Sequence, residues 1–553
     1  MKKLLSLLII SCLILAVTSS NLFSQISQGG TPISFRLDGL NKAVEIKNIP
    51  APDMEQIIME DMENDGMGKA YRIGVLLPVN LNPTNSGTWE TLDNGDMLWR
   101  LQIDMKGCEA SNLYFDHFFL PQGARLFVYS PSKTFTIGAF TEFNNHESGL
   151  MATESVPGGS QILELYLPAE HTLNFELNIS EVGYNYRSTG YGKEKDDLTC
   201  MVNVKCPPAS SWQTQVNGAA KIEIKNGANN FLCSGSLVNN TLNSCEPYFL
   251  LADHCAYYGG YATPANHTQW IFRFNYQAAS CTGTTSSTTK TSVGCTMKAH
   301  DTYGQTNSGS DFYLVLLNNA IPSTYQVYYN GWNKSGIAAS SGASIHHPGG
   351  VIKKFSIFST PLVNNSTHWK VTWANQPGYG HSVTAGGSSG SPIFDQNKLI
   401  VGTLTGGWSY CSAPNDADVY GKFSYHWASN GTTNAKQLKP WLDPINSNPT
   451  TQAGVNYNAC SPADVTDFTG PNLNINIFPN PASDYISVSF ENYDFDNGSM
   501  LIVDALGKVI STSQIDMLAG EIIVPVHNYA DGIYHVHIRN NDHSFSGTFM
   551  ISK

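Results

Sequence analysis

A serine in a glycine-rich stretch is the residue that most directly suggests chemistry in this sequence. Ser389 lies between Gly387 and Gly390 in a run that extends from Ala385 to Pro392. A serine hydroxyl is a weak nucleophile, so acyl transfer requires a base, a group that orients the base, and donors for the developing oxyanion. Glycines let the backbone turn tightly enough for its N–H groups to face a reacting carbonyl. The stretch predicts Ser389 as a nucleophile and the N–H groups of Gly387 and Ser389 as an oxyanion hole. A simple turn between strands is the competing interpretation, in a chain with 48 glycines.

Two further residues can supply the other roles of a serine hydrolase. His254 follows an apolar run that begins at Tyr248, and Asp311 directly precedes the apolar run of residues 312–317. Taken singly, each residue can have a purely structural role instead: His254 as a core histidine and Asp311 as a turn-capping aspartate. Together with Ser389 they provide a base, an orienting carboxylate and a nucleophile from three separate β elements. Chain order alone proves little, because such triads occur in several orders.

The elements that must position these residues are predicted to be strands. Apolar or alternating runs of six or seven residues, bounded by Pro, Gly or Asn, recur along the chain, and helical periodicity is confined to a short stretch near residues 435–442. Examples of such runs are residues 97–103, 124–129, 162–167, 270–276 and 312–317. The sequence therefore predicts an all-β protein, and its 553 residues predict about three domains.

Composition shifts and turn-rich stretches suggest the domain boundaries. We expect a signal peptide over residues 1–24, a β-sandwich domain over 25–195, a central domain over 196–455, a linker over 456–473 and a small β-sandwich domain over 474–553. The charged stretch Lys193–Asp197 marks an exposed junction and a processing point. It separates the first β domain from the central one, which contains all three candidate catalytic residues.

The N-terminus indicates export. Lys2 and Lys3 precede an apolar run over residues 4–17 and then small residues, a pattern typical of a secretory signal peptide cleaved after Ser20 or Ser24. Because no other stretch reaches 18 apolar residues, we expect no membrane span in the mature protein. The net charge of −13 argues against nucleic acid as a partner, since phosphate binding needs a basic face.

The cysteines fit an exported protein. Of eleven cysteines, Cys12 lies in the leader and eight fall between Cys200 and Cys411, with Cys108 and Cys460 outside this set. An even number within one segment predicts a disulfide framework, whose connectivity the spacing alone does not fix. A zinc site is disfavoured because no Cys-x-x-Cys pair occurs.

The central segment resembles the lysyl endopeptidases, secreted bacterial serine proteases with the double β-barrel of trypsin. The similarity runs over residues 200–445, and the preceding β segment resembles the propeptide of that family. The residues that carry it are Cys233–Thr241, Tyr248–Cys255, Ser310–Phe312, Ile345–Pro348, Gly387–Pro392, Gly406–Gly407 and Cys411–Ala413, with Trp99–Leu101 and Pro121–Ala124 in the propeptide-like part.

The resemblance implies a role for each matching residue. His254 would be the general base, Asp311 its orienting carboxylate and Ser389 the nucleophile. Asp418 matches the carboxylate at the base of the specificity pocket, and neighbouring Asp416 is the competing candidate. Thr405 stands where the family carries a histidine associated with lysine preference.

The resemblance also implies disulfide pairs. Cys200 would pair with Cys411, Cys206 with Cys281, and Cys233 with Cys255. Cys245 and Cys295 remain, and we predict an additional bridge between them. The adjacent His346 and His347 are interpreted as a structural pair beside a turn rather than as metal ligands.

The last 80 or so residues resemble the C-terminal sorting domain of proteins exported by the type IX secretion system; an ordinary β adhesion module is the alternative. The matching features are Ile477–Ala482, Asp504–Lys508, Gly532–Tyr534 and the terminal Lys553. This resemblance implies contact with the secretion machinery and release to the medium or the cell surface.

We therefore predict a secreted, monomeric serine endopeptidase, made as a zymogen, that cleaves polypeptides after lysine without a cofactor or metal. Arginine or dual Lys/Arg specificity is one alternative, because residues 196–455 contain thirteen lysines and a single arginine, Arg273, a composition that would protect an arginine-cleaving enzyme from itself. A non-catalytic surface binding protein on a protease scaffold is the other.

Overall fold

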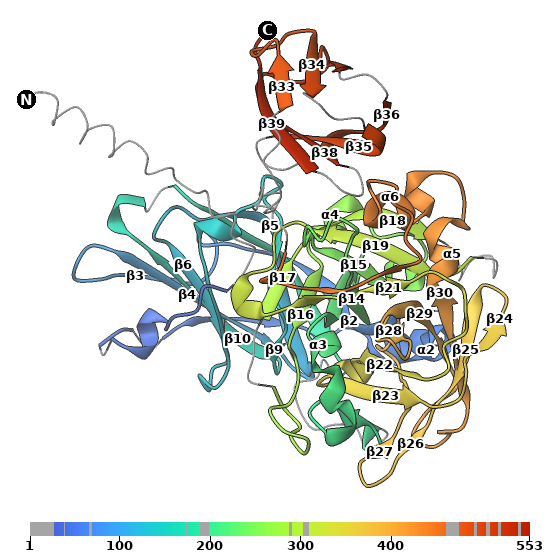
Figure 1. Ribbon diagram of the computed structural model, residues 1–553. Coiled ribbons are helices and arrows are strands. Elements are labelled where there is room, and N and C mark those ends of the chain that lie inside the picture. Colours follow the sequence, from blue (N-terminus) through green and yellow to red (C-terminus); the bar gives the residue numbers. More distant parts are fainter. Residues whose placement is uncertain are drawn as a thin grey trace, which may run out of the picture.

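The structure is a computed structural model that describes most of residues 27–553. The residues outside the description are 1–26, 38, 42, 66–68, 172–173, 188–197, 287–289, 302–308, 461–474, 491–494, 505–508, 518–520 and 540–543. The expected signal peptide, the Lys193–Asp197 junction and nearly all of the expected linker therefore lie outside it. Strands dominate the described residues, which confirms the all-β prediction (Figure 1).

The N-terminal domain is a β-sandwich with a short helix at its edge. Its elements are η1 (Ile33–Phe35), β1 (Glu45–Ile49), α2 (Met54–Asn64), β2 (Tyr71–Leu81), β3 (Thr88–Thr91), β4 (Met97–Met105), β5 (Ala110–Phe119), β6 (Arg125–Tyr129), β7 (Thr136–Phe140), η2 (Glu142–Asn144), β8 (Met151–Ala152), β9 (Val156–Pro157), β10 (Ser160–Leu167), η3 (Ala169–His171) and β11 (Glu176–Asn185). One sheet has the order β1-β4-β10-β6-β7, and the facing strands run β2-β11-β5-β8. The two layers bury a common apolar core, to which Trp99 and Phe115 contribute from opposite sheets.

The first barrel of the central domain carries His254 and Asp311. Its elements are β13 (Ala219–Asn226), β14 (Asn229–Leu237), β15 (Tyr248–Leu251), η6 (Asp253–Ala256), α4 (Pro264–His267), β16 (Ile271–Phe274), β17 (Lys290–Val293), β18 (Cys295–Asp301) and β19 (Phe312–Leu317). Strand pairing runs β17-β16-β13-β14-β15-β19-β18. Because β17 and β18 are separated in the chain only by Gly294, this order closes on itself around the core of Phe249, Phe272 and Val315.

The second barrel carries Ser389 and Asp418. Its main strands are β12 (Val202–Asn203), β22 (Gly342–His346), β23 (Lys354–Phe358), β24 (Val363–Asn365), β25 (His368–Thr372), β28 (Pro392–Phe394), β29 (Ile400–Gly407) and β30 (Ala417–Lys422), paired in the order β12-β23-β22-β28-β29-β30-β25-β24. A backbone hydrogen bond from Ala374, just past β25, returns to Ile357 in β23 and brings the two sides of this sheet together. Leu250 of the first barrel and Ile345 of the second share one buried cluster, so the barrels pack face to face.

Short elements connect and cover the barrels. They are η5 (Pro207–Trp212), α3 (Gln213–Val216), η7 (Ser323–Tyr325), β20 (Tyr328–Tyr329), β21 (Trp332–Asn333), η8 (Pro348–Gly350), β26 (Asn375–Gln376), β27 (Gly380–His381), α5 (Phe423–Ala428), η9 (Asn434–Lys436), α6 (Lys439–Leu442), β31 (Thr451–Gln452) and β32 (Val455–Asn456). The helix expected over 435–442 is split into η9 and α6, with a proline at the start of α6.

The N-terminal domain is joined to the first barrel by continuous strand pairing. β2 pairs antiparallel with β14, so sandwich strands and barrel strands belong to one 12-stranded sheet. Around this junction Tyr114 donates to Asn230 over 2.6 Å, and Ser155 donates to Glu223 over 2.8 Å. These buried contacts make the interface an extension of the two cores.

The C-terminal domain has its own small core. Its strands are β33 (Ile475–Phe478), β34 (Tyr485–Phe490), β35 (Phe495–Asp504), β36 (Val509–Met517), β37 (Glu521–Pro525), β38 (Gly532–Arg539) and β39 (Ser544–Ile551). They form sheets β33-β34-β37 and β36-β35-β38-β39, which enclose Ile486, Ile502 and Val536. Among the helices that the structure describes in the whole chain, none is long and apolar enough to span a membrane.

Three of the four expected disulfides are present. Cys200–Cys411, Cys206–Cys281 and Cys233–Cys255 form as the resemblance implies. The predicted Cys245–Cys295 bridge is wrong, because Cys245 pairs with Cys460 and Cys295 is a buried free thiol.

The placement of the strands explains why Cys245 pairs with Cys460 and not with Cys295. Cys295 starts β18 and lies in the first-barrel core, whereas Cys245 is on the loop between β14 and β15. β32 pairs with β20 and thereby returns the chain to the first barrel just before Cys460. The packed part of the central domain therefore extends to Cys460, beyond the boundary expected at residue 455.

We predict that Cys460→Ser lowers the free energy of unfolding of the Ser389→Ala chain by about 2–4 kcal/mol, because it removes a cross-link that constrains the unfolded state. Urea unfolding measures this loss. Peptide mapping under non-reducing conditions should yield a linked Cys245–Cys460 peptide, and alkylation after denaturation should modify Cys108 and Cys295. A linked Cys245–Cys295 peptide would contradict the assignment.

Candidate active site

His254 and Asp311 form a buried pair at the end of the first barrel. β15 delivers His254 into η6, and Asp311 stands directly before β19, which pairs with β15. Asp311 Oδ2 lies 2.8 Å from His254 Nδ1, and Asp311 Oδ1 accepts from the His254 backbone N–H at 3.0 Å. Two contacts from one carboxylate to one residue fix both the position and the orientation of the ring.

The charge on Asp311 is stabilised by these contacts. The residue is fully buried, and burial alone would raise its pKa. Attraction to His254 and the hydrogen bonds from it outweigh burial and hold the pKa of Asp311 below its ordinary value. Because Nδ1 of His254 faces this ionised carboxylate, Nε2 is the ring nitrogen that can accept a proton.

The backbone of Asp311 adopts a conformation that needs support. Its φ of 59° lies in the left-handed region, which non-glycine residues seldom occupy. The carboxylate contacts to His254 and a hydrogen bond from Thr403 Oγ1 to the Asp311 carbonyl at 3.3 Å hold it there. Thr403 belongs to β29, so the second barrel also positions this carboxylate.

Ser389 lies in a tight loop that precedes β28. The Ser388 N–H donates to Ala385 and the Ser391 N–H to Ser388, at 2.9 and 3.0 Å. Gly387 and Gly390 have φ of 87° and 80°, and an added Cβ would approach other backbone or side-chain atoms to 2.8 and 2.5 Å. Glycine is therefore required at both positions beside the candidate nucleophile.

The loop is connected to β14 and to the end of β15, which leads into His254. Ser234 of β14 donates its backbone N–H to the Ser389 carbonyl at 2.8 Å and its Oγ to the Gly387 carbonyl at 2.9 Å. Gly390 approaches Leu251 and Ala252 so closely that a Cβ there would lie 2.7 Å from the Ala252 nitrogen. These contacts hold the Ser389 loop against β14 and against the two residues that directly precede Asp253 and His254.

The serine and the histidine are not hydrogen-bonded to one another. Nε2 of His254 is buried and has no hydrogen-bond partner in the described part of the chain, and Ser389 is 9% exposed. The structure thus joins two members of the candidate triad directly and packs the loop of the third against β14 and the end of β15. Within the described residues, neither the Gly387 nor the Ser389 N–H donates a hydrogen bond, which leaves both available to an oxyanion.

Asp418 lies inside the second barrel on β30, opposite Gly407 of β29. It is fully buried and accepts hydrogen bonds from Trp373 Nε1 at 2.6 Å, Thr384 Oγ1 at 2.8 Å, Ser409 Oγ at 2.6 Å and the Ser409 N–H at 3.1 Å. Burial raises the pKa of Asp418, and these donors oppose that rise. A carboxylate held by neutral donors keeps a negative charge that an incoming cation can neutralise.

The competing candidate, Asp416, has an exposed side chain and does not share this environment. Thr405, at the position where a histidine was expected from the resemblance, has its Oγ1 3.0 Å from His368 Nε2. His346 contacts Ser388 and Ser356 at 2.8 and 3.1 Å, and His347 contacts the Val351 carbonyl at 3.0 Å.

Burial lowers the pKa of His346 to about 3 and also lowers that of His347. Both rings are therefore neutral and hold the turn by hydrogen bonds to neighbouring residues. No cluster of three potential metal ligands occurs in the residues that the structure describes.

A second acid, which the sequence did not single out, lies beside His254. Asp253 is buried next to His254 and contacts His300 Nδ1 at 2.8 Å and Tyr261 OH at 2.9 Å. Burial is the main cause that raises its pKa to about 6. The signal was present, since Asp253 precedes His254 directly, but His300 and Tyr261 reach it only through the fold.

Two parts of the chain match models of known protein families. Residues 195–421 match the family model described as "Lysyl endopeptidase, C-terminal domain", and residues 476–552 match "Secretion system C-terminal sorting domain". A lysyl endopeptidase from Pseudomonas aeruginosa is 29% identical over 289 residues, which cover 49% of this chain and 60% of that protein.

Two solved structures with partial likeness are described by their titles as a protease and as a Glu endopeptidase. The protease Anisep from Arthrobacter nicotinovorans is 17% identical, covers 37% of this chain and 90% of its own, and has a TM-score of 0.28. A Glu endopeptidase is 17% identical, covers 40% of this chain and 90% of its own, and has a TM-score of 0.27.

The chain is thus a multidomain all-β protein in which two packed barrels hold a buried His–Asp pair and a serine loop. More specifically, its central part is similar to the lysyl endopeptidase C-terminal domain and its last part to the secretion system C-terminal sorting domain.

We predict that Asp253→Asn, in the Ser389→Ala chain, changes how stability depends on pH. An acid whose pKa is raised by folding stabilises the protein below its unfolded pKa, and this contribution is lost as pH rises through the folded value. For Asp253 the window runs from about 4 to about 6. Relative to its parent, the variant should therefore gain about 1–3 kcal/mol between pH 4 and 7, measured by urea unfolding. The exposed Asp416→Asn should show no such trend, and parallel curves for all three chains would contradict the assignment.

Proposed function

We propose that the chain is a secreted serine endopeptidase that hydrolyses peptide bonds after lysine. The observation that carries this proposal is the buried Asp311–His254 pair, whose Nε2 has no partner in the described part of the chain, together with the packing of the Ser389 loop against Leu251 and Ala252, just before His254. A binding protein without chemistry would have no need of an ionised carboxylate aimed at Nδ1 of a histidine. The family matches support the same activity.

In the proposed mechanism, His254 Nε2 takes the proton of Ser389 as its Oγ attacks the scissile carbonyl. Asp311 keeps the imidazole in the required tautomer and stabilises the imidazolium that forms. The Gly387 and Ser389 N–H groups stabilise the oxyanion of the tetrahedral intermediate. His254 then protonates the leaving amine, and a water molecule hydrolyses the acyl-enzyme by the same steps. All groups come from the chain itself, so no cofactor is needed.

Lysine preference is assigned to Asp418. A buried carboxylate favours a substrate cation and rejects a neutral side chain that would leave its charge uncompensated. A lysine ammonium is a compact donor, whereas the planar guanidinium of arginine needs paired acceptor positions. Both oxygens of Asp418 already accept hydrogen bonds from Trp373, Thr384 and Ser409, which favours the compact cation. Arginine or dual specificity is the alternative that paired substrates must test.

The flanking domains support a proposed order of processing and export. The chain would be made with a leader and an N-terminal domain that is later removed, and its C-terminal sorting domain would direct it through the secretion machinery to the medium or the cell surface.

We predict that a fluorophosphonate labels the processed wild-type enzyme at Ser389 and that Ser389→Ala abolishes both labelling and peptidase activity. Asp311→Asn should lower turnover by about 10⁴, because the histidine loses its orienting charge. Mass spectrometry of the adduct and hydrolysis of a lysyl peptide measure these effects. The exposed Ser340→Ala should retain full activity. Processed enzyme that neither reacts with the probe nor cleaves peptides would favour a binding protein.

We predict that Asp418→Asn lowers kcat/KM for a lysyl peptide by about 10²–10⁴ and has a much smaller effect on a norleucyl peptide. Because burial raises the pKa of Asp418, the wild-type preference for lysyl over norleucyl substrate should decrease as the pH falls through that pKa. The ratio of kcat/KM for the two substrates is used because protonation of His254 affects both substrates equally and cancels. Asp416→Asn is the matched control, and equal turnover of lysyl and arginyl peptides would remove the lysine assignment.

A further inference from the structure

Three neighbouring strands of the second barrel face the segment that holds Asp311. Gly421 of β30 pairs on one side with Thr403 of β29 and on the other side with His368 of β25. A Cβ added to Gly421 would lie 1.8 Å from the Ser310 carbonyl oxygen, so glycine is required for the close approach of the two barrels. His368 and Thr403 therefore flank the point where the first barrel delivers Asp311.

A bulge in β29 places a hydroxyl group on the Asp311 carboxylate. The register of β29 against β30 shifts between Leu404 and Gly406, so Thr405 is the extra residue at the bulge. Bulges redirect side chains locally and are common beside active sites. Burial would raise the pKa of Asp311, and the buried Thr405 side chain is one of the hydrogen-bond donors that, with the charge of His254, lower it instead.

His368 continues this contact away from the carboxylate. Its Nε2 lies 3.0 Å from Thr405 Oγ1, and its Nδ1 lies 2.8 Å from Thr367 Oγ1. Thr367 Oγ1 also lies 2.8 Å from the carbonyl oxygen of Gly309, two residues before Asp311. These side chains form a chain of contacts that leaves the Asp311 segment at its backbone and returns to it at the carboxylate.

The His368 ring is neutral in this chain of contacts. The residue is 3% exposed, and burial lowers its pKa to about 4, although the negative charge of Asp311 raises the pKa and the positive charge of Lys422 lowers it. The neighbouring His426 is also neutral, since burial lowers its pKa to about 3. A neutral imidazole carries one N–H, which lies on either Nδ1 or Nε2.

The number of hydroxyl protons determines which nitrogen of His368 carries the proton. If Nδ1 carried it, Nε2 would accept the single Thr405 proton, and Asp311 would lose this donor. If Nε2 carries it, Nε2–H donates to Thr405, Thr405 donates to Asp311, and Nδ1 accepts from Thr367. A hydrogen bond to a carboxylate is about twice as strong as one between neutral groups, which favours the second arrangement.

We propose that His368 is a positioning residue for Asp311: its Nε2–H donates to Thr405 and thereby directs the Thr405 hydroxyl proton to the carboxylate. This inference rests on the proposed peptidase function, in which Asp311 must remain ionised while His254 gains and loses a proton. An additional donor on the carboxylate lowers its own affinity for that proton and keeps the proton on the imidazole. His368 acts only through Thr405.

The tautomer of His368 can be tested independently of activity. Nitrogen NMR of the Ser389→Ala chain with isotope-labelled histidines distinguishes protonated from unprotonated ring nitrogens. We expect His368 to carry its proton on Nε2 alone at neutral pH, with its signals assigned by their loss in His368→Gln. A proton on Nδ1, alone or together with one on Nε2, overturns the proposal.

Turnover tests the effect on Asp311, in processed enzyme whose reactive Ser389 is titrated with a fluorophosphonate. Thr405→Val should lower kcat for a lysyl peptide by about tenfold, because the carboxylate loses a charge-assisted hydrogen bond. His368→Met should lower kcat by about threefold or more with KM nearly unchanged, because the Thr405 hydroxyl is no longer held in one orientation. His368→Gln can still donate from its amide and should stay within about twofold of wild type.

A double variant separates positioning from a general structural role. His368→Met combined with Thr405→Val should lose no more kcat than Thr405→Val alone, because both changes act through one hydrogen bond. Losses that multiply overturn the proposal, as does a His368→Gln enzyme as slow as His368→Met. Thermal unfolding checks that each variant is folded. If His368→Met does not fold, the tautomer measured by NMR decides.

His267→Met is the matched control. His267 is 4% exposed, burial lowers its pKa to about 4, and its Nε2 lies 2.8 Å from the Tyr313 hydroxyl. It is therefore an equally buried neutral imidazole with a hydroxyl partner, but it lies on α4 and outside the chain of contacts to Asp311. Its kcat should stay within about twofold of wild type, and a loss equal to that of His368→Met would overturn the assignment.

Failure of this proposal can be distinguished from failure of the proposed function. Processed wild-type enzyme that reacts with the fluorophosphonate, together with a His368→Met variant of wild-type kcat, overturns only the positioning role. Processed wild-type enzyme that neither reacts with the probe nor cleaves the peptide overturns the peptidase function itself.

Discussion

The structure of the central domain depends on one buried carboxylate. Asp311 is excluded from water, and its ionised form persists because both oxygens contact His254. This places strict demands on the fold, since β15 and β19 must pair in register and Thr403 must reach across from the second barrel. A buried charge that loses such partners is strongly destabilising. The two barrels are therefore constrained to meet at this point.

The pairing of β14 explains why the N-terminal domain is joined so closely to the first barrel. One edge of β14 pairs with β13 along nearly its whole length. The other edge pairs with β15 only at Ser236 and Leu237, so its part near Phe231 would be unpaired without β2. Unpaired edges attract extended chains. β2 satisfies this edge through the pairing of Tyr71 with Leu232 and of Arg72 with Phe231. The N-terminal domain thereby protects the barrel from pairing with other extended chains.

How far the sequence could be interpreted depended on whether a feature was local. The apolar run before His254, the apolar run after Asp311 and the glycines around Ser389 each predict their own surroundings, and the structure places them accordingly. The Cys245–Cys460 bridge could not be predicted, because it requires β32 to return to β20, a pairing of two-residue strands that has no pattern in the sequence. Likewise, the contact of His300 with Asp253 and the contact of Tyr71 with Gly386 join residues distant in sequence, and no spacing rule connects them.

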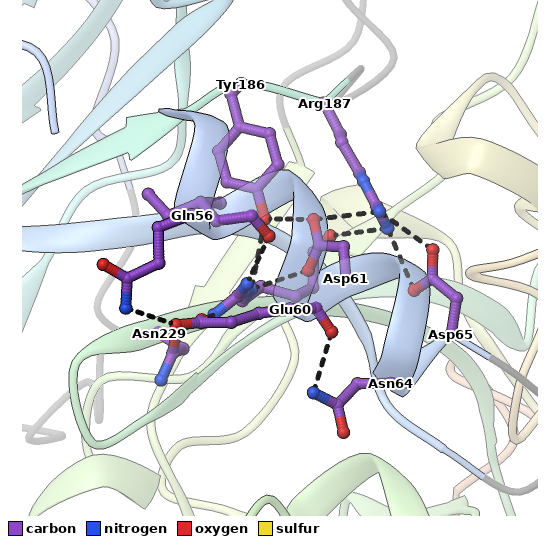
Figure 2. A network of polar contacts seen from close by, with 10 residues as sticks. Gln56, Glu60, Asp61, Asn64, Asp65, Tyr186, Arg187 and Asn229 are labelled. Atoms are coloured by element: carbon purple, nitrogen blue, oxygen red, sulfur yellow. Dashed lines mark hydrogen bonds and ion pairs between the residues drawn. The ribbon is translucent and has the colours of Figure 1, made fainter. Parts of the chain in front are cut away.

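Asp418 and Asp61 show how one chain handles two buried acids in different ways. Asp61 is neutralised permanently by Arg72 and Arg187, so its contribution is to fix α2 against β2 (Figure 2). Asp418 is surrounded instead by the neutral donors of Trp373, Thr384 and Ser409, which orient the carboxylate but leave its charge uncompensated. A charge held in this way costs folding free energy that only an external cation can recover. An acid paired with an internal cation therefore belongs to the scaffold, and an acid paired only with neutral donors is suited to recognise a ligand.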